Sequence, residues 1–107
     1  MRVLLDECTP RPLARDFAGI NAAHVHDLSW WGRRNGAFLA GMLAEGFTIF
    51  VTVDRNLAWQ QNIPASGITV IVLRAAKNRL RDLRPLLPEV RRIVATAVAG
   101  EVYHVRG

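Results

Sequence analysis

Carboxylate side chains follow two apolar segments of the sequence. Asp6 and Glu7 come directly after residues 3–5, and Asp54 follows residues 48–53. If these segments are neighbouring parallel strands, their carboxyl ends converge and bring the acidic groups together. Carboxylates in one cleft repel each other, and Mg²⁺ or Mn²⁺ would relieve that repulsion while activating water against a phosphodiester. The sequence therefore predicts a metal site at Asp6, Asp54 and Glu7.

Each of these carboxylates also has a structural interpretation. Asp54 could cap a short helix that follows it, and Asp6 could cap the first helix or pair with an arginine. Glu7 is adjacent to Asp6, so on a continuing strand it would point to the opposite face. The location of the acidic residues at the ends of two buried strands favours the site over these structural roles.

Histidine and cysteine offer weaker alternatives. His24 and His26 are two residues apart and would share one side of a strand, but the sequence suggests no third zinc ligand. Packed or solvated histidines are therefore the favoured interpretation. Cys8 is the single cysteine, which excludes an internal disulfide, and it is expected to be a small buried side chain.

The chain is basic, and arginine supplies nearly all of its positive charge. There are 14 basic and 9 acidic residues, the net charge is +5, and Lys77 is the one lysine. Arginine suits bidentate phosphate contacts, so the composition favours an anionic partner; mutational bias toward arginine is the alternative. The candidates for substrate contact are Arg33, Arg34, Arg55 and Trp59. Core packing or a homodimer contact is the alternative role for the tryptophans.

Short apolar runs alternate with helical patterns along the chain. The predicted strands cover residues 3–5, 22–26, 48–53, 68–73 and 101–105. The predicted helices cover residues 10–18, after a Thr9 cap, then 36–45, a short stretch at 56–61, and 82–99. This alternation predicts an α/β fold, a three-layer α/β/α sandwich around a mostly parallel sheet of four to five strands.

Length and hydropathy bound the class of protein. At 107 residues the chain is expected to form a single domain, residues 1–107. Half of the residues are hydrophobic, which excludes a disordered chain. No apolar run approaches the roughly 18–20 residues that span a bilayer, and Asp6 and Glu7 interrupt any N-terminal signal segment. We therefore expect a cytoplasmic protein that does not bind membranes.

Three segments carry a family resemblance through their order and spacing. They are residues 3–7 (VLLDE), 31–36 (WGRRNG) and 50–57 (FVTVDRNL). In this order they resemble small PIN-like proteins, compact relatives of PIN-domain nucleases that are often toxin components of bacterial toxin–antitoxin pairs. The similarity continues through residues 60–62 and 68–73, so it covers nearly the whole chain.

The resemblance implies a PIN-like sandwich with an acidic site for Mg²⁺ or Mn²⁺, single-stranded RNA as substrate and an antitoxin protein as partner. Asp6 matches the first-strand aspartate, a metal ligand, and Glu7 follows it as in many relatives. Asp54 matches the aspartate after the threonine-containing strand. Asn35 and Asn56 stand where related sequences often have acidic residues. A neutral amide orients water but adds no charge, so these two departures lower the expected metal affinity.

The residues and the resemblance together suggest three alternative functions, each from a different class. The first is a metal-dependent endoribonuclease with Asp6, Glu7, Asp54, Asn35 and Asn56 at its centre. The second is a catalytically weakened PIN-like module that binds RNA or a protein without turnover. The third is a response-regulator receiver phosphorylated on Asp54. Arg74 after the fourth strand, where a receiver needs Ser or Thr, and the lack of a lysine after the fifth strand argue against it.

Overall fold

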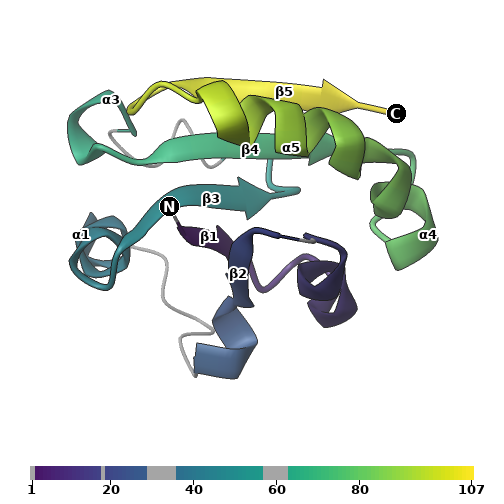
Figure 1. The fold of residues 1–107 in the computed structure, drawn as a ribbon, viewed down its shortest axis with the longest axis horizontal. Helices are drawn as coiled ribbons and strands as arrows, with labels where there is room; N and C mark the ends of the chain where they lie inside the picture. The colour runs from purple at the N-terminus through teal and green to yellow at the C-terminus, as the bar shows by residue number, and fades with distance from the viewer. Residues whose placement is uncertain (1, 18, 29–35, 57–62) are drawn as a thin grey trace.

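The computed structural model describes residues 2–17, 19–28, 36–56 and 63–107, in which strands and helices alternate (Figure 1). The strands are β1 (Arg2–Leu5), β2 (Asn21–His24), β3 (Phe47–Thr52), β4 (Thr69–Arg74) and β5 (Val102–Arg106). The helices are α1 (Gly36–Ala44), α3 (Ile63–Ser66), α4 (Leu80–Leu83) and α5 (Leu87–Thr96), with 3-10 turns η1 (Arg11–Asp16), η2 (Val25–Leu28) and η3 (Arg84–Leu86). This arrangement confirms the predicted α/β class.

All five strands form one parallel sheet in the order β2-β1-β3-β4-β5. The chain reverses its direction of winding between β1 and β3, because β2 lies on one side of β1 and the later strands lie on the other. Leu5 at the end of β1 pairs with Val51 near the end of β3. In open parallel sheets the ligand site lies outside the carboxyl ends of the strands at such a reversal. The fold therefore directs attention to the segments that follow Leu5 and Thr52.

Alternate residues of the strands lie on opposite faces of the sheet and pack into two separate hydrophobic cores. Val3, Leu5 and Val51 face a core shared with η1, α4 and α5, whereas Leu4 and Phe50 face a core shared with α1 and α3. The ring of Phe50 meets Phe38 of α1 edge to face, with centroids 5.4 Å apart, a geometry worth about 0.5–1.5 kcal/mol beyond burial. Both faces of the sheet are covered, which makes the three-layer sandwich and explains why the central strands β1, β3 and β4 are mostly apolar.

Two predicted helix boundaries differ from the structure. The helix expected after Thr9 is the 3-10 turn η1, and Thr9 does not cap it: its hydroxyl donates to the Asp6 carbonyl at 2.7 Å. The helix expected over residues 82–99 is divided into α4, η3 and α5. Pro85 and Pro88 lack the N–H of a regular helix interior, so each occupies a first turn.

The described helices give no membrane-spanning candidate: none of them is long and apolar enough to cross a bilayer.

Gly100 lies between α5 and β5 in a backbone conformation that favours glycine. Its φ is +85°, and a Cβ would lie 3.0 Å from the Pro64 carbonyl oxygen. We expect Gly100→Ala to lower the free energy of unfolding by about 1–2 kcal/mol from the backbone conformation alone, with the contact adding to this. Gly41→Ala is the matched control, since nothing lies within 4 Å of its Cβ and it should gain about 0.5–1 kcal/mol of helix stability. Urea unfolding followed by circular dichroism measures both, and equal midpoints for the two variants would contradict the assignment.

Candidate functional site

The backbone of Asp6 fixes the turn that follows β1. Its N–H donates to the Val51 carbonyl at 2.9 Å and so continues the pairing of β1 with β3 by one residue. Its carbonyl accepts both the N–H and the hydroxyl of Thr9, at 3.0 and 2.7 Å. Asp6 is therefore held by the sheet on one side and by its own loop on the other.

The Asp6 carboxylate is buried, with a relative exposure of 2%, and three donors surround it. The Glu7 N–H donates to Oδ1 at 2.8 Å, while the Thr52 hydroxyl and the Cys8 thiol donate to Oδ2 at 2.7 and 3.0 Å. A carboxylate has about four acceptor sites, and a buried charge is tolerated only when such donors compensate its lost hydration. The orientation of the Asp6 carboxylate is therefore set by the two residues that follow it in the sequence and by Thr52 of β3.

Thr52 connects the two acidic residues. Its single hydroxyl proton goes to Asp6, and its oxygen accepts the N–H of Asp54 at 3.0 Å. The Asp6 carboxylate and the Asp54 backbone N–H are thus both bonded to one fully buried hydroxyl, and the ends of β1 and β3 lie side by side as expected. Thr52 is not among the site residues that the sequence predicts. Its one signal there is a hydroxyl at the end of a mostly apolar strand, two residues before an aspartate.

Asp54 has a structural role as well as a place at the site. Its Oδ1 accepts the Asn56 N–H at 2.9 Å, which closes a local turn after β3. Asp54 is partly buried, whereas Arg55 and Asn56 are exposed. The short helix expected at residues 56–61, which Asp54 could cap, lies outside the described residues except for Asn56. The capping-type interpretation and the site are compatible, because the turn orients the Asp54 carboxylate.

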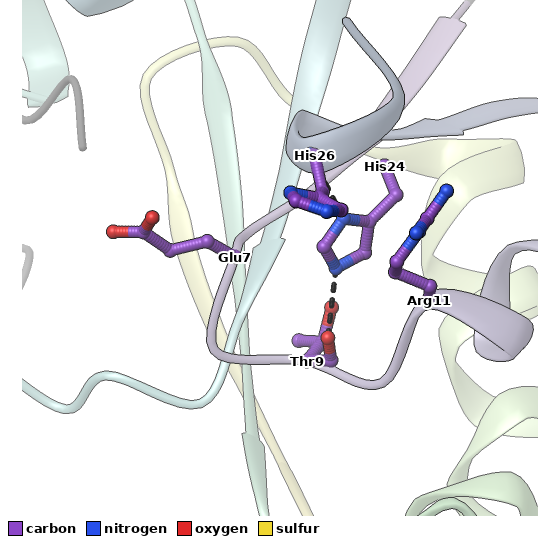
Figure 2. Close-up of a pocket in the computed structure, with 5 residues that line it drawn as sticks. All are labelled: Glu7, Thr9, Arg11, His24 and His26. Carbon is purple, nitrogen blue, oxygen red and sulfur yellow. Dashed lines mark hydrogen bonds between the residues drawn. The ribbon is translucent and has the colours of Figure 1, made fainter. Parts of the chain in front are cut away.

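Glu7 is exposed and lies at the rim of a hollow beside the end of β2. It lines a hollow of about 500 Å³ with Thr9, Arg11, His24 and His26, and its carboxylate extends away from both histidines (Figure 2). Across the described ranges, no group of three or more His, Cys, Asp or Glu side chains is arranged to hold a metal ion.

His24 is a packed residue with both ring nitrogens engaged. Its Nδ1 accepts the His26 N–H at 3.0 Å, so Nδ1 carries no proton. The proton is on Nε2, which donates to the Thr9 carbonyl at 2.7 Å (Figure 2). His24 is 1% exposed, and neither nitrogen is directed at a ligand. The packed interpretation of the histidines therefore fits His24, and a zinc pair with His26 does not.

Burial and a neighbouring negative charge both shift the pKa of the Cys8 thiol. Burial raises the pKa of Cys8 above its ordinary value, and the negative charge of Asp6 and the hydrogen bond to its Oδ2 raise it further. The hydrogen bond with Thr52 acts in the opposite direction. The raised pKa makes Cys8 less nucleophilic than an ordinary thiol, in keeping with its hydrogen bond to Asp6.

Basic side chains lie beyond Asp54 along the same edge of the sheet. Arg55 follows Asp54 and lines a hollow together with Arg74 and Arg106, the last residues of β4 and β5. Of these three arginines, Arg55 alone was predicted from the sequence to contact substrate. The other predicted site residues, Arg33, Arg34, Asn35 and Trp59, lie outside the described residues.

Comparisons with known proteins returned nothing: no protein-family model, curated protein or solved structure matches the chain.

We expect Thr52→Val to lower the free energy of unfolding by about 1–3 kcal/mol, because the isosteric change removes a donor to a buried carboxylate. Thr48→Val is the matched control on the same strand. The Thr48 hydroxyl is buried without a partner in the described part of the chain, so its removal should be neutral or stabilising. Urea unfolding of both variants measures the difference, and equal losses would show that the Thr52 hydrogen bonds contribute nothing particular.

We expect Asp6→Asn to lower the pKa of Cys8, because it removes the charge that opposes thiolate formation. Alkylation by iodoacetamide at a fixed pH below the wild-type pKa should therefore be faster in this variant. Thr52→Val should change the rate in the opposite direction. Every adduct is at Cys8, since the chain has one cysteine. An unchanged rate in Asp6→Asn would contradict the assignment, and a rate equal to that of the urea-unfolded chain would reveal loss of the fold instead.

Proposed function

We propose that the chain is a PIN-like, metal-dependent endoribonuclease that acts on single-stranded RNA. The observation that carries the proposal is the junction of Asp6 and Asp54 through one buried hydroxyl at the reversal point of a parallel sheet. Arginines next to this junction supply charge for phosphate contacts. An antitoxin protein as partner, or a second copy of the chain, belongs to the same proposal.

The donor set of the site fits Mg²⁺ or Mn²⁺. These hard cations prefer carboxylate oxygens, and Mg²⁺ is commonly held by very few carboxylates together with water and substrate phosphates. Asp6 and Asp54 would hold the ion, with the thiol of Cys8 as the weakest of the donors that compete for Asp6. A cation bound there would acidify a water molecule and neutralise charge that develops on the phosphodiester.

The chain itself would supply orientation and charge. Thr52 and the Glu7 N–H keep the Asp6 carboxylate in one rotamer, so little reorganisation is needed when ligand binds. Glu7 is exposed on the β2 side of Asp6 and would accept a proton from attacking water as a general base. Arg55 would hold a substrate phosphate on the β4 side. The RNA strand would therefore run across the carboxyl edge of the sheet.

Cleavage of a labelled single-stranded RNA in Mn²⁺, in Mg²⁺ and in EDTA tests the proposal. We expect cutting only with the divalent ions, and Asp6→Asn or Asp54→Asn should reduce its rate by at least about 100-fold, since charge stabilisation by a metal is worth several kcal/mol. Asp82→Asn is the matched control, because Asp82 pairs with Arg79 on the surface of α4. Circular dichroism establishes that the variants are folded. Cutting that survives in folded Asp54→Asn would overturn the assignment.

A binding module without turnover is the second candidate, and the surroundings of Asp6 favour it. Three protein donors already bond its carboxylate, and Asn56 adds no charge after β3. RNA binding in EDTA, with no cutting under either divalent ion, would select this candidate over the nuclease.

A receiver is the third candidate, and the strand order is the observation in its favour. The order β2-β1-β3-β4-β5 occurs in receivers as well. However, β4 ends at Arg74 and is followed by Ala75 and Ala76, which provide no hydroxyl for a phosphoryl group. Labelling of Asp54 by acetyl phosphate would be needed to restore this candidate.

A further inference from the structure

Three arginines gather in a hollow at the ends of β3, β4 and β5. The hollow has a volume of about 290 Å³ and is lined by Arg55, Arg74, Ala75, Ala76, Arg106 and Gly107. None of these lining residues is acidic. The volume lies just below the range of about 300–1,000 Å³ that is usual for small-molecule pockets, and so suits one small anionic group rather than a whole cofactor.

The register of the sheet forces two of these charges together. Arg74 and Arg106 are paired positions on neighbouring parallel strands, and the Gly107 N–H donates to the Arg74 carbonyl at 2.9 Å to hold the strand ends in place. Paired positions on neighbouring strands share one face of the sheet, and like charges there repel. The chain therefore maintains an unfavourable pair that a bound anion would relieve.

These arginines lack acceptors within the described residues, as do the exposed Arg15 and Arg81, but only these three share one hollow at the strand ends. Most of the described arginines bond a carboxylate or a carbonyl: Arg2, Arg11, Arg79, Arg84, Arg91 and Arg92. Within the described residues, no hydrogen bond or ion pair engages the side chains of Arg55, Arg74 or Arg106, and the Nε of Arg74 is buried without a partner. A buried donor without an acceptor is costly. A ligand with oxygen acceptors would therefore bind favourably to these three arginine side chains.

The positive charge of Arg74 and Arg106 also acts on the nearby His104. His104 lies on β5 and is paired with Val72 of β4. Burial lowers the pKa of His104, and the charges of Arg74 and Arg106 lower it further. An anion between these arginines would weaken their effect on the imidazole. His104 is therefore a built-in reporter of what the hollow binds.

We propose that Arg55, Arg74 and Arg106 form a phosphate-binding subsite. Guanidinium groups bond phosphate oxygens in pairs, and several of them around one hollow suit a tetrahedral anion. Arg55 directly follows Asp54, so the subsite adjoins the acidic site along the carboxyl edge of the sheet. The assignment of this phosphate to an RNA strand rests on the proposed function, whereas the phosphate chemistry does not.

Titration of His104 by NMR, in EDTA and with inorganic phosphate as the probe, tests the subsite. We expect phosphate to raise the pKa of His104 saturably in the wild type. In Arg74→Gln/Arg106→Gln, binding should be at least about tenfold weaker, because charged hydrogen bonds are lost. In the double variant without phosphate, the pKa of His104 should already be raised, since its positive neighbours are gone. His104→Gln identifies the resonance among the three histidines.

Arg15→Gln is the control for net charge, because Arg15 is exposed on η1, where it lines a different hollow. It should retain the phosphate effect on His104. The double variant should be no less stable than the wild type in urea, since it relieves a like-charge pair. An absent phosphate effect in the wild type, or an effect equal in the double variant, would overturn the subsite.

The source of the phosphate is distinguished by short single-stranded oligoribonucleotides with and without a 5′-phosphate, used as competitors in the same titration. Equal competition supports a backbone phosphate, and competition only by the phosphorylated strand supports a terminal one. Competition by neither strand would overturn the assignment to RNA. Because the titration contains no divalent ion and no cleavage, a failed subsite and a failed nuclease assignment give separate results.

Discussion

The hydrogen bond from the Thr52 hydroxyl to the buried Asp6 carboxylate is the contact on which the candidate site depends. It joins β1 to β3 through side chains and places Asp54 through the same oxygen. Removing a charged group from water costs several kcal/mol, and each charged hydrogen bond returns about 1.5–3 kcal/mol. The donors around Asp6 therefore offset its burial without a large net gain. An apolar side chain here would leave the buried Thr52 hydroxyl without its acceptor, so the carboxylate and its donors depend on one another.

The parallel sheet brings polar side chains from distant parts of the sequence together at one edge, where all five strands end. The segments after β1 and β3 supply carboxylates, β2 ends with the packed imidazole of His24, and β4 and β5 end with arginines. Helices on both faces leave this edge as the place where polar side chains can meet. The edge is acidic at its centre and basic toward β5. A phosphodiester strand matches that order of charge, with a cation between its phosphate and the carboxylates and arginine beneath the next phosphate.

The strands were predictable because they are short, apolar and bounded by polar residues or glycine. The adjacency of β1 and β3 followed from the rules of parallel crossovers, and with it the proximity of the segments that carry Asp6 and Asp54. Thr52 could not be assigned from sequence, since a strand-end threonine is usually a β-branched filler and its role depends on a cross-strand distance. The Arg74 and Arg106 pair depended on the register of β4 and β5, which no local pattern specifies. The Thr9 cap was wrong because the nearby Asp6 carbonyl competes for the same hydroxyl.

In the proposed nuclease, the charges along this edge would make metal binding depend on bound RNA. With neutral Asn56 after β3 and with Asp6 already bonded by three donors, the protein attracts a divalent cation less strongly than a cluster of fully available carboxylates would. The arginines next to it attract phosphate more strongly. Since substrate phosphates are themselves ligands for Mg²⁺, a strand held by the basic end of the edge would complete the coordination that the protein leaves open. Cation and RNA would then bind with positive coupling, and such coupling is reciprocal. Metal affinity measured without RNA would understate the affinity of the working site.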